Sequence, residues 1–308
     1  MGAIVGLVKS QNSQEEIDNS IRRVLSLIGF EPRSSVNNVD IKVNLSYYWS
    51  AATGCTTDPR IVAGVIDWIR EKYGADTKIR LVEADATAMR TKHAFAMLGY
   101  EKLAKEKKVQ LFNLSNDDVE DTKVSVNGRE ISFQVPLSLL KSDLFINMPK
   151  LKILCETRVT CALKNMFGCI ASSRKIVYHS LLNEAIVGIN KILHTNLTIV
   201  DGIIAKGRVP IELGLIMASE DAFSIDWIAS QIMGYEPSRI GHLTMAIKEK
   251  VGSPKDIVLR GEDMSVFKRR FPKAGFFFSP FWQDLQFRFL RLYCRIVNDI
   301  IPPTMERE

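Results

Sequence analysis

The chain of 308 residues has no long hydrophobic run, and this absence argues against a membrane-spanning helix. Such a helix needs about 18 or more consecutive apolar residues, and no stretch reaches that length. The short apolar segment from Met1 to Val8 has no basic region before it, and it stops in the polar sequence Ser10–Ser13. We therefore interpret it as a first strand and not as a signal peptide.

Cysteine is also scarce, with five residues in all. The number is odd, and the residues lack the paired spacing of a disulfide-rich secreted scaffold. This usage is typical of a reducing compartment, so we predict a cytoplasmic protein.

Three common catalytic or nucleotide-binding motifs are missing. The sequence has no Gly-x-Gly-x-x-Gly fingerprint, no Walker loop and no serine-centred nucleophile elbow. Internal repeats and low-complexity linkers are absent too. No motif therefore indicates a nucleotide ligand, and nucleic acid is not an expected partner.

The overall composition is that of a globular protein with a sizeable core. Apolar residues make up 46% of the chain and charged residues 25%. The length suits one large domain or two lobes. A net charge of +6 and a pI of about 9.0 favour anionic partners, although a basic protein without a charged partner remains the alternative.

Apolar strands alternate with amphipathic helices along the chain. The expected strands are Ala3–Val8, Val39–Asn44, Lys78–Ala84, Val109–Asn113, Leu144–Met148, Leu197–Val200, Leu213–Ala218 and Ile257–Arg260. The expected helices are Ser13–Leu27, one from Asp58 onwards, Thr91–Lys107, Thr157–Phe167, Ser180–Ile192, Asp221–Met233 and Ile240–Lys248. This alternation predicts an α/β fold with a mostly parallel sheet flanked by helices.

Local signals mark several element ends. Ser13 and Glu16 form a capping-box pattern, and Gly29 is a suitable end for the same helix. Asp58 followed by Pro59 is a typical helix start. The segment Lys123–Gln134 contains Asn-Gly between two alternating runs, which predicts an inserted β-hairpin with a type I′ turn.

The last 43 residues differ from the α/β domain, which we assign to residues 1–265. A basic, aromatic, helical tail is predicted for 266–308. Its apolar positions at helical spacing are Trp282, Leu285, Phe289, Tyr293, Ile296 and Ile300, and another face carries Arg288, Arg291 and Arg295. Such a helix packs on its own domain, packs on a second subunit in a homo-oligomer, or lies on a membrane surface as a peripheral contact.

The stretch from Leu144 to Ile170 concentrates cations, amides and thiols around a predicted strand-to-helix junction. Helix starts carry free backbone N–H groups, so ammonium groups beside them make an anion site. The candidate ligands of a small anion are Lys150, Lys152, Arg158, Lys164 and Asn165. Crowding also lowers a lysine pKa, which makes Lys164 a candidate base or nucleophile.

Further candidates come from other predicted strand ends and loops. Lys42 and Asn44 end the second strand, and Arg174 precedes His179, a candidate general base. Asp201 follows a strand, where sites in open α/β sheets gather. With Asp221 and Asp226 it makes a carboxylate set for a divalent cation or for acid–base work, although Asp221 is equally a helix cap.

Four cysteines are candidate metal ligands. Cys155, Cys161 and Cys169 are spaced by six and eight residues, which is not a ferredoxin or zinc-finger spacing. Three thiolates with Cys55 as a fourth would hold an iron–sulfur cluster or a metal ion. The alternative is that all four are small buried hydrophobic residues.

Several pieces in a fixed order carry a resemblance to a known family. They are Lys42-Val43-Asn44, Thr56-Thr57-Asp58-Pro59, Gly99-Tyr100, Asn147 to Lys152, Val159 to Gly168, Tyr178-His179, Val200-Asp201-Gly202, and Asp221 with Asp226. The chain resembles, from about Val36 to Gly261, the family known as domain of unknown function 362 (DUF362), some members of which are labelled iron–sulfur centre proteins.

The chain departs from the family pattern in places. Leu154 stands where the family often has a histidine, and Val209-Pro210 replaces a Gly-Pro pair. Many relatives carry a ferredoxin module that this sequence lacks. The resemblance therefore implies a shared scaffold and pocket.

Three hypotheses follow from the sequence. The first is an enzyme for a small anionic substrate, held by the lysines and arginines, with Lys164, Asp201, Asp226 and His179 in catalytic roles. The second is an iron–sulfur or metal-binding redox protein. The third is a membrane- or partner-docking protein led by the tail.

Overall fold

The structure is a computed structural model that describes residues 2–31, 35–154, 156–207, 209–268, 271, 289 and 292. Its strands are β1 (Ile4–Lys9), β2 (Asn38–Lys42), β3 (Lys78–Glu83), β4 (Gln110–Asn113), β5 (Val119–Val126), β6 (Arg129–Pro136), β7 (Leu144–Asn147), β8 (Lys150–Leu154), β9 (Arg158–Thr160), β10 (Leu197–Lys206), β11 (Pro210–Ser219) and β12 (Val258–Gly261). Its α-helices are α1 (Gln14–Ile28), α2 (Pro59–Tyr73), α3 (Thr91–Met97), α4 (Tyr100–Lys107), α5 (Leu137–Leu140), α6 (Ala162–Met166), α7 (Leu182–Ile192), α8 (Ala222–Ile232) and α9 (Gly241–Lys248). Short 3₁₀ turns are η1 (Ala51–Thr53), η2 (Leu114–Asn116), η3 (Phe167–Cys169), η4 (Lys175–Leu181), η5 (Pro237–Arg239) and η6 (Met264–Val266).

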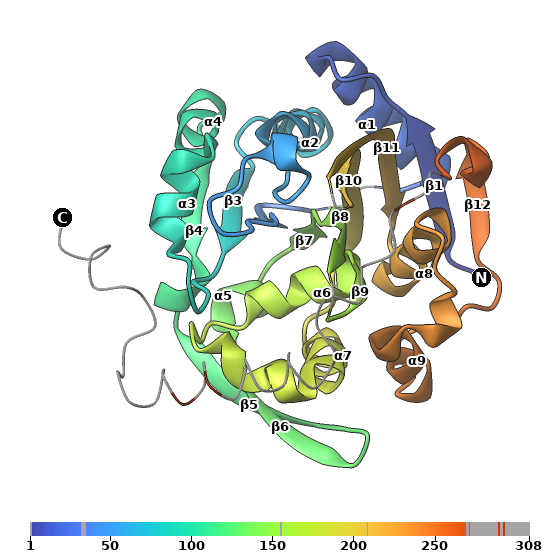
Figure 1. Cartoon of the computed structure of the whole chain (residues 1–308). Coiled ribbons are helices and arrows are strands. Elements are labelled where there is room, and N and C mark those ends of the chain that lie inside the picture. Colours follow the sequence, from blue (N-terminus) through green and yellow to red (C-terminus); the bar gives the residue numbers. More distant parts are fainter. Residues whose placement is uncertain are drawn as a thin grey trace.

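A mixed sheet runs through the molecule in the order β12-β1-β11-β10-β7-β2-β3-β4. The pairs from β10 through β7, β2 and β3 to β4 are parallel, whereas β11 is antiparallel to both of its neighbours. Helices α1 and α2 lie on one side of this sheet and α6 to α9 on the other (Figure 1). The prediction of an α/β fold with a mostly parallel, helix-flanked sheet is confirmed.

Side chains of the strands pack into apolar cores on both faces of the sheet. In β10, Leu197 and Ile199 face the core that contains α1 and α2, while Val200 faces the core that contains α8. Every residue of Leu144–Asn147 is buried. A strand that is buried on both faces needs apolar residues on both, which explains the continuous apolar run in this part of the sequence.

The predicted helix starts and the hairpin agree with the structure. Ser13 caps α1 by accepting a hydrogen bond from the Glu16 N–H group, and Asp58 caps α2 with Pro59 in its first turn. The turn of the hairpin β5–β6 has φ of 51° at Asn127 and 76° at Gly128, as a type I′ turn requires. The hairpin packs one face on α7 and extends away from the sheet (Figure 1).

One predicted helix is divided in two. The structure ends α3 at Met97 and starts α4 at Tyr100, where the sequence predicted a single helix. Gly99 separates them with φ of 83°, a left-handed conformation that interrupts a right-handed helix. The ring of Tyr100 is then buried, and its hydroxyl donates to the Thr57 carbonyl at 2.7 Å.

The largest correction concerns the segment after Pro149. The prediction that Pro-Lys-x-Lys leads straight into a helix over Thr157–Phe167 is wrong. Lys150–Leu154 forms β8, which pairs with β10 in parallel and with β9 in an antiparallel hairpin, and the helix begins only at Ala162. Leu151 and Ile153 point into an apolar core, so the alternating lysines mark a strand and not a helix start.

Within the described ranges, no helix is long and apolar enough to cross a bilayer. The predicted tail over 266–308 lies outside the described residues except for 266–268, Phe271, Phe289 and Leu292.

Candidate functional site

Polar side chains that the fold buries gather where the parallel strands end. Lys42 ends β2, Glu83 ends β3, Asn147 ends β7, and Lys150 and Lys152 lie on β8, which continues along β10 beyond β7. The carboxyl ends of parallel strands form one edge of a sheet, and binding sites in open α/β folds are found there. This edge therefore holds the candidate site.

Two buried ion pairs form the floor of this edge. The Lys42 Nζ lies 2.7 Å from a carboxylate oxygen of Glu83, with side chains only 1% and 4% exposed. Glu83 also accepts the backbone N–H groups of Leu45 and Ala84 at 3.1 and 3.0 Å. The charge of Lys42 is thus neutralised, and this predicted anion ligand supports the loop after β2.

The second ion pair joins Lys150 to Asp201, again at 2.7 Å and with both side chains fully buried. Asp201 also accepts the N–H groups of Asp58 at 2.8 Å and Ile203 at 3.2 Å. The pair therefore connects β8, β10 and the start of α2. The predicted carboxylate at 201 and cation at 150 neutralise each other.

A row of amides crosses the site from Lys152 to α6. Lys152 Nζ donates to Asn44 Oδ1 at 2.6 Å, Asn44 Nδ2 donates to Asn165 Oδ1 at 2.7 Å, and Asn165 Nδ2 donates to Asn147 Oδ1 at 2.7 Å. Asn147 Nδ2 completes the row by donating to the Ala162 carbonyl at 3.0 Å. Three of the predicted ligands thus form one hydrogen-bonded network.

Lys152 has neutral hydrogen-bond acceptors: Asn44 Oδ1 and, at 3.0 Å, the Cys55 carbonyl. Burial, helped by the neighbouring charges of Lys164 and Lys206 and opposed by Cys55, lowers the pKa of Lys152 to about 7. An ammonium group without a carboxylate partner contributes positive potential to this edge.

Lys164, on α6, is partly buried with its Nζ 4.1 Å from the centroid of the Phe167 ring. In the part of the chain that the structure describes, no hydrogen bond or ion pair holds this ammonium group. Burial lowers the pKa of Lys164 to about 8, an effect that Glu156 opposes and Lys42 increases. It is the least constrained of the site's lysines.

Glu156 and His179 face each other beside Lys164. Their Oε1 and Nδ1 atoms are 3.4 Å apart, and both side chains are partly exposed. Burial acts to raise the pKa of Glu156, but the hydrogen bond and charge of His179 and the charge of Lys164 outweigh it, so the pKa is lowered. The ring of His179 also packs edge-on against Phe167.

Loops from different strands are bonded together around this group. The Arg90 N–H donates to the Tyr48 hydroxyl at 3.1 Å, which joins the loop after β3 to the loop after β2. The Ile176 N–H donates to Thr87 Oγ1 at 3.3 Å, and Thr87 in turn contacts the Ser173 carbonyl. These hydrogen bonds connect the loops after β2 and β3 with the segment before α7.

Three predicted residues lie apart from this group. Arg158 is exposed on β9, with φ of 62°, and its guanidinium donates to the Arg239 carbonyl at 3.0 Å. Arg174 is exposed just before η4. Asp226 is fully buried and accepts the N–H groups at the start of α6, Ala162 at 2.6 Å and Leu163 at 3.1 Å. Asp226 thus positions the helix that carries Lys164.

Asp221 has the capping role that the sequence allowed, because it accepts the N–H groups of Phe223 and Ser224 at the start of α8. No ligand contact is needed to explain it.

The cysteines are buried where the structure describes them. Cys55, Cys161 and Cys169 are free thiols, and Cys155 lies outside the described residues. Burial raises the pKa of Cys169 to about 12 and that of Cys161 well above its ordinary value, which disfavours the thiolate that binds metals. Among the described side chains, no group of three or more His, Cys, Asp or Glu is placed to hold a metal ion.

Four residues of the site were not predicted from the sequence: Glu83, Glu156, Lys175 and Asn147. Glu83 and Asn147 had a usable signal, since each ends a buried parallel strand. Lys175 is buried and donates to the Asp85 carbonyl at 2.6 Å, and burial lowers its pKa to about 8. Glu156 depends on the turn between β8 and β9, which the helix prediction obscured.

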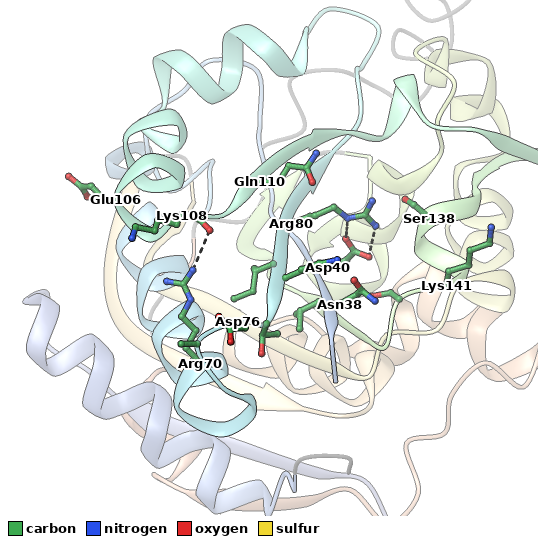
Figure 2. Close-up of a pocket in the computed structure, with 16 residues that line it drawn as sticks. Asn38, Asp40, Arg70, Asp76, Arg80, Glu106, Lys108, Gln110, Ser138 and Lys141 are labelled. Atoms are coloured by element: carbon green, nitrogen blue, oxygen red, sulfur yellow. Dashed lines mark hydrogen bonds and ion pairs between the residues drawn. The ribbon is translucent and has the colours of Figure 1, made fainter. Parts of the chain in front are cut away.

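An open pocket lies at the opposite edge of the sheet, at the amino ends of β2, β3 and β4 (Figure 2). Its two arginines are engaged in hydrogen bonds. Arg80 binds Asp40 through two hydrogen bonds of 2.7 and 2.9 Å, and Arg70 donates to the Lys107 carbonyl. Because this pocket is at the amino ends of the strands, we assign the chemistry to the carboxyl edge.

Known proteins resemble this chain in sequence and in fold. Thylakoid-associated protein sll1697 from Synechocystis is 27% identical over 270 residues, covering 80% of this chain and 79% of that protein. The structure of the lactate racemase apoprotein from Thermoanaerobacterium thermosaccharolyticum superposes with a TM-score of 0.51 at 13% identity, covering 75% of this chain. The chain spans 57% of the length of that structure, and the likeness shows a shared fold.

The model of the family described as domain of unknown function (DUF362) matches residues 39–231, which is more than half of the chain and includes β2 to α8 with most of the site. The chain therefore belongs to the DUF362 family.

Proposed function

We propose that this protein is an enzyme that binds a small anionic substrate beside Lys164, at the carboxyl edge of its sheet. The observation that carries the proposal is the contrast between the lysines. Lys42 and Lys150 are neutralised by carboxylates at 2.7 Å, whereas Lys152 and Lys164 have no such ion pair among the described residues. Positive potential is therefore left around Lys152 and Lys164, which lie near enough for the charge of Lys164 to lower the pKa of Lys152.

The neighbouring groups suit proton transfer near neutral pH. The pKa of Lys164 is lowered to about 8, and the Glu156–His179 pair lies beside it. A general acid or base works best when its pKa is close to the working pH. The site thus combines an anion-binding charge with groups that exchange protons.

The test is ligand-dependent thermal stabilisation with a panel of small carboxylates and phosphates. Lactate belongs in the panel, because the protein with a similar fold is named for it. A ligand that binds only the folded state raises the midpoint of unfolding, and the rise grows with the logarithm of ligand concentration once that exceeds the dissociation constant. We expect at least one acid to stabilise the wild-type protein.

Lys164→Met removes the charge and keeps an apolar stem against Phe167, while Lys102→Met removes a lysine whose side chain is 81% exposed. We expect the first variant to weaken binding more than tenfold and the second to bind as the wild type does. Equal binding by both variants would refute the proposal.

A second candidate function, membrane association, is favoured by the name of the thylakoid-associated relative. We propose that the basic tail leads it. In the full chain, replacing Arg288, Arg291 and Arg295 by glutamine should reduce flotation with vesicles of anionic lipid. Unchanged flotation would remove the tail from this role, and a concentration-dependent mass would favour a second subunit as its partner.

A further inference from the structure

We infer that the Lys164 amine forms an imine with its substrate, so that the substrate class is a small acid that also carries an aldehyde or ketone group. This inference rests on the proposed function and deepens it. An anion site needs only a charge, but an imine needs an amine whose lone pair is free to attack. The lysines of this edge differ in that respect.

The other buried lysines are committed to hydrogen bonds. Lys42 donates to the Val43 carbonyl at 2.6 Å as well as to Glu83, and Lys150 donates to Asp201. Lys152 donates to Asn44 and Cys55, and Lys175 donates to the Asp85 carbonyl. Each would have to break these contacts before it could react.

Lys164 has no comparable acceptor in the described part of the chain. Its Nζ lies over the ring of Phe167, a contact that imposes no directional hydrogen bond. The lowered pKa of Lys164 adds support, because a larger fraction of the amine is neutral at pH 8 than for an exposed lysine. The nucleophile is thus unconstrained and partly deprotonated.

The Glu156–His179 pair supplies the proton transfers that imine formation requires. The neutral Nζ attacks the carbonyl carbon, and the amine loses a proton as the carbonyl oxygen gains one, which gives a carbinolamine. The Glu156–His179 pair delivers a proton to the hydroxyl, which leaves as water, and the protonated imine remains on Nζ. One water is released, and nothing is oxidised or reduced.

Lys152 also lacks a carboxylate partner, and it lies near enough for the charge of Lys164 to lower its pKa. A bound carboxylate favours the charged form of a neighbouring lysine, so Lys152 would face the acid group of the substrate while Lys164 reacts. The two lysines therefore divide the roles of holding the anion and attacking the carbonyl.

The experiment is reductive trapping. The full chain is incubated at pH 8 with glyoxylate and cyanoborohydride, and the modified lysine is located by peptide mass spectrometry. We expect a saturable adduct at Lys164, and an acid that lacks an aldehyde or ketone group should compete with its formation. Adducts spread over exposed lysines such as Lys102, with no excess at Lys164, would overturn the inference.

One variant controls for a folding effect, and one lysine of the wild type controls for a low pKa alone. Lys164→Arg keeps the positive charge but offers no primary amine, so its adduct should disappear. Lys175 in the wild type has a similarly lowered pKa but donates to the Asp85 carbonyl, so it should carry no saturable adduct. Thermal unfolding of Lys164→Arg shows that it is folded. Trapping that continues unchanged in Lys164→Arg would contradict the inference.

Failure of the inference and failure of the proposed function can be told apart. If an acid without an aldehyde or ketone group stabilises the wild type but no adduct forms, the proposed anion site is supported and the imine is excluded. If Lys164→Arg retains that stabilisation and loses only the adduct, both are supported. If neither stabilisation nor adduct is found, both are refuted.

Discussion

Replacing Glu83 by glutamine removes the charge that neutralises Lys42 in the interior. The two side chains are 4% and 1% exposed, and Glu83 also receives hydrogen bonds from the Leu45 and Ala84 N–H groups. Glutamine has one carbonyl oxygen for three donors, and its amide group would point N–H groups at another donor. Breaking a buried pair from one side costs about 3–5 kcal/mol, because a buried charge is left without compensation.

The surface pair between Lys102 and Glu106 provides the matched control. These atoms are 3.8 Å apart, and the side chains are 81% and 59% exposed. An exposed i,i+4 pair contributes about 0.3–0.5 kcal/mol, so Glu106→Gln should change stability very little. Urea denaturation of both variants beside the wild type measures the two differences in the free energy of unfolding.

A double variant separates charge from packing. In Lys42→Met with Glu83→Met, no buried charge remains, and we expect part of the loss in Glu83→Gln to be recovered, since apolar replacement of a whole buried pair is often close to neutral. If Glu83→Gln costs no more than Glu106→Gln, the argument that this ion pair supports the floor of the site is wrong.

Three further predictions concern α6, pH and metal. Asp226→Asn leaves the Ala162 and Leu163 N–H groups with a weaker, uncharged acceptor. We therefore expect the free energy of unfolding, measured by urea denaturation, to fall by about 1–3 kcal/mol, and hydrogen exchange at the start of α6 to become faster. The pKa of Lys175 is lowered to about 8 in the folded state, so the unfolded state binds more protons above that pH, and stability should rise with pH between about 8 and 10.5. Lys175→Met should reduce this rise relative to the wild type, whereas Lys102→Met should not. Protein purified without oxygen should contain no stoichiometric iron or sulfide, because Cys161 and Cys169 are buried thiols with raised pKa values, and stoichiometric iron that is lost in Cys161→Ser would restore the cluster hypothesis.

Local signals predicted the elements whose ends depend on a few adjacent residues. Ser13 and Asp58 act as caps through their own side chains, and Asn127-Gly128 adopts positive φ where few other pairs do so readily. These features need no distant contact. The hairpin of β8 and β9 does need one, because Lys150 and Lys152 are buried only where Asp201 and Asn44 receive them. Without those partners, two lysines beside a proline look like a solvated helix start.

The edge of the sheet that carries the site was predictable for a similar reason. Each of Lys42, Asn44 and Lys150 was predicted as a ligand from its place at or just after a strand end, and parallel strands end at the same side of a sheet. Which charges cancel was not predictable, since the pairing of Lys42 with Glu83 depends on β2 and β3 lying in register across 41 residues of sequence. The same holds for Asp226, whose carboxylate reaches a helix start 64 residues earlier in the chain.

The row of amides from Asn147 to Lys152 has a direction. Each asparagine accepts a hydrogen bond through its oxygen and donates one through its nitrogen. The Asn44 oxygen at the end of the row therefore faces a donor, the Lys152 ammonium group. Turning any one amide round would set oxygen against oxygen at one of its contacts, and turning all three would set the Asn147 oxygen against the Ala162 carbonyl. An anion would therefore be repelled by the Asn44 oxygen at the end of this row and would have to reach Lys152 from another side of its ammonium group. The network that holds the lysine in place thus also limits the directions from which an anion would approach it.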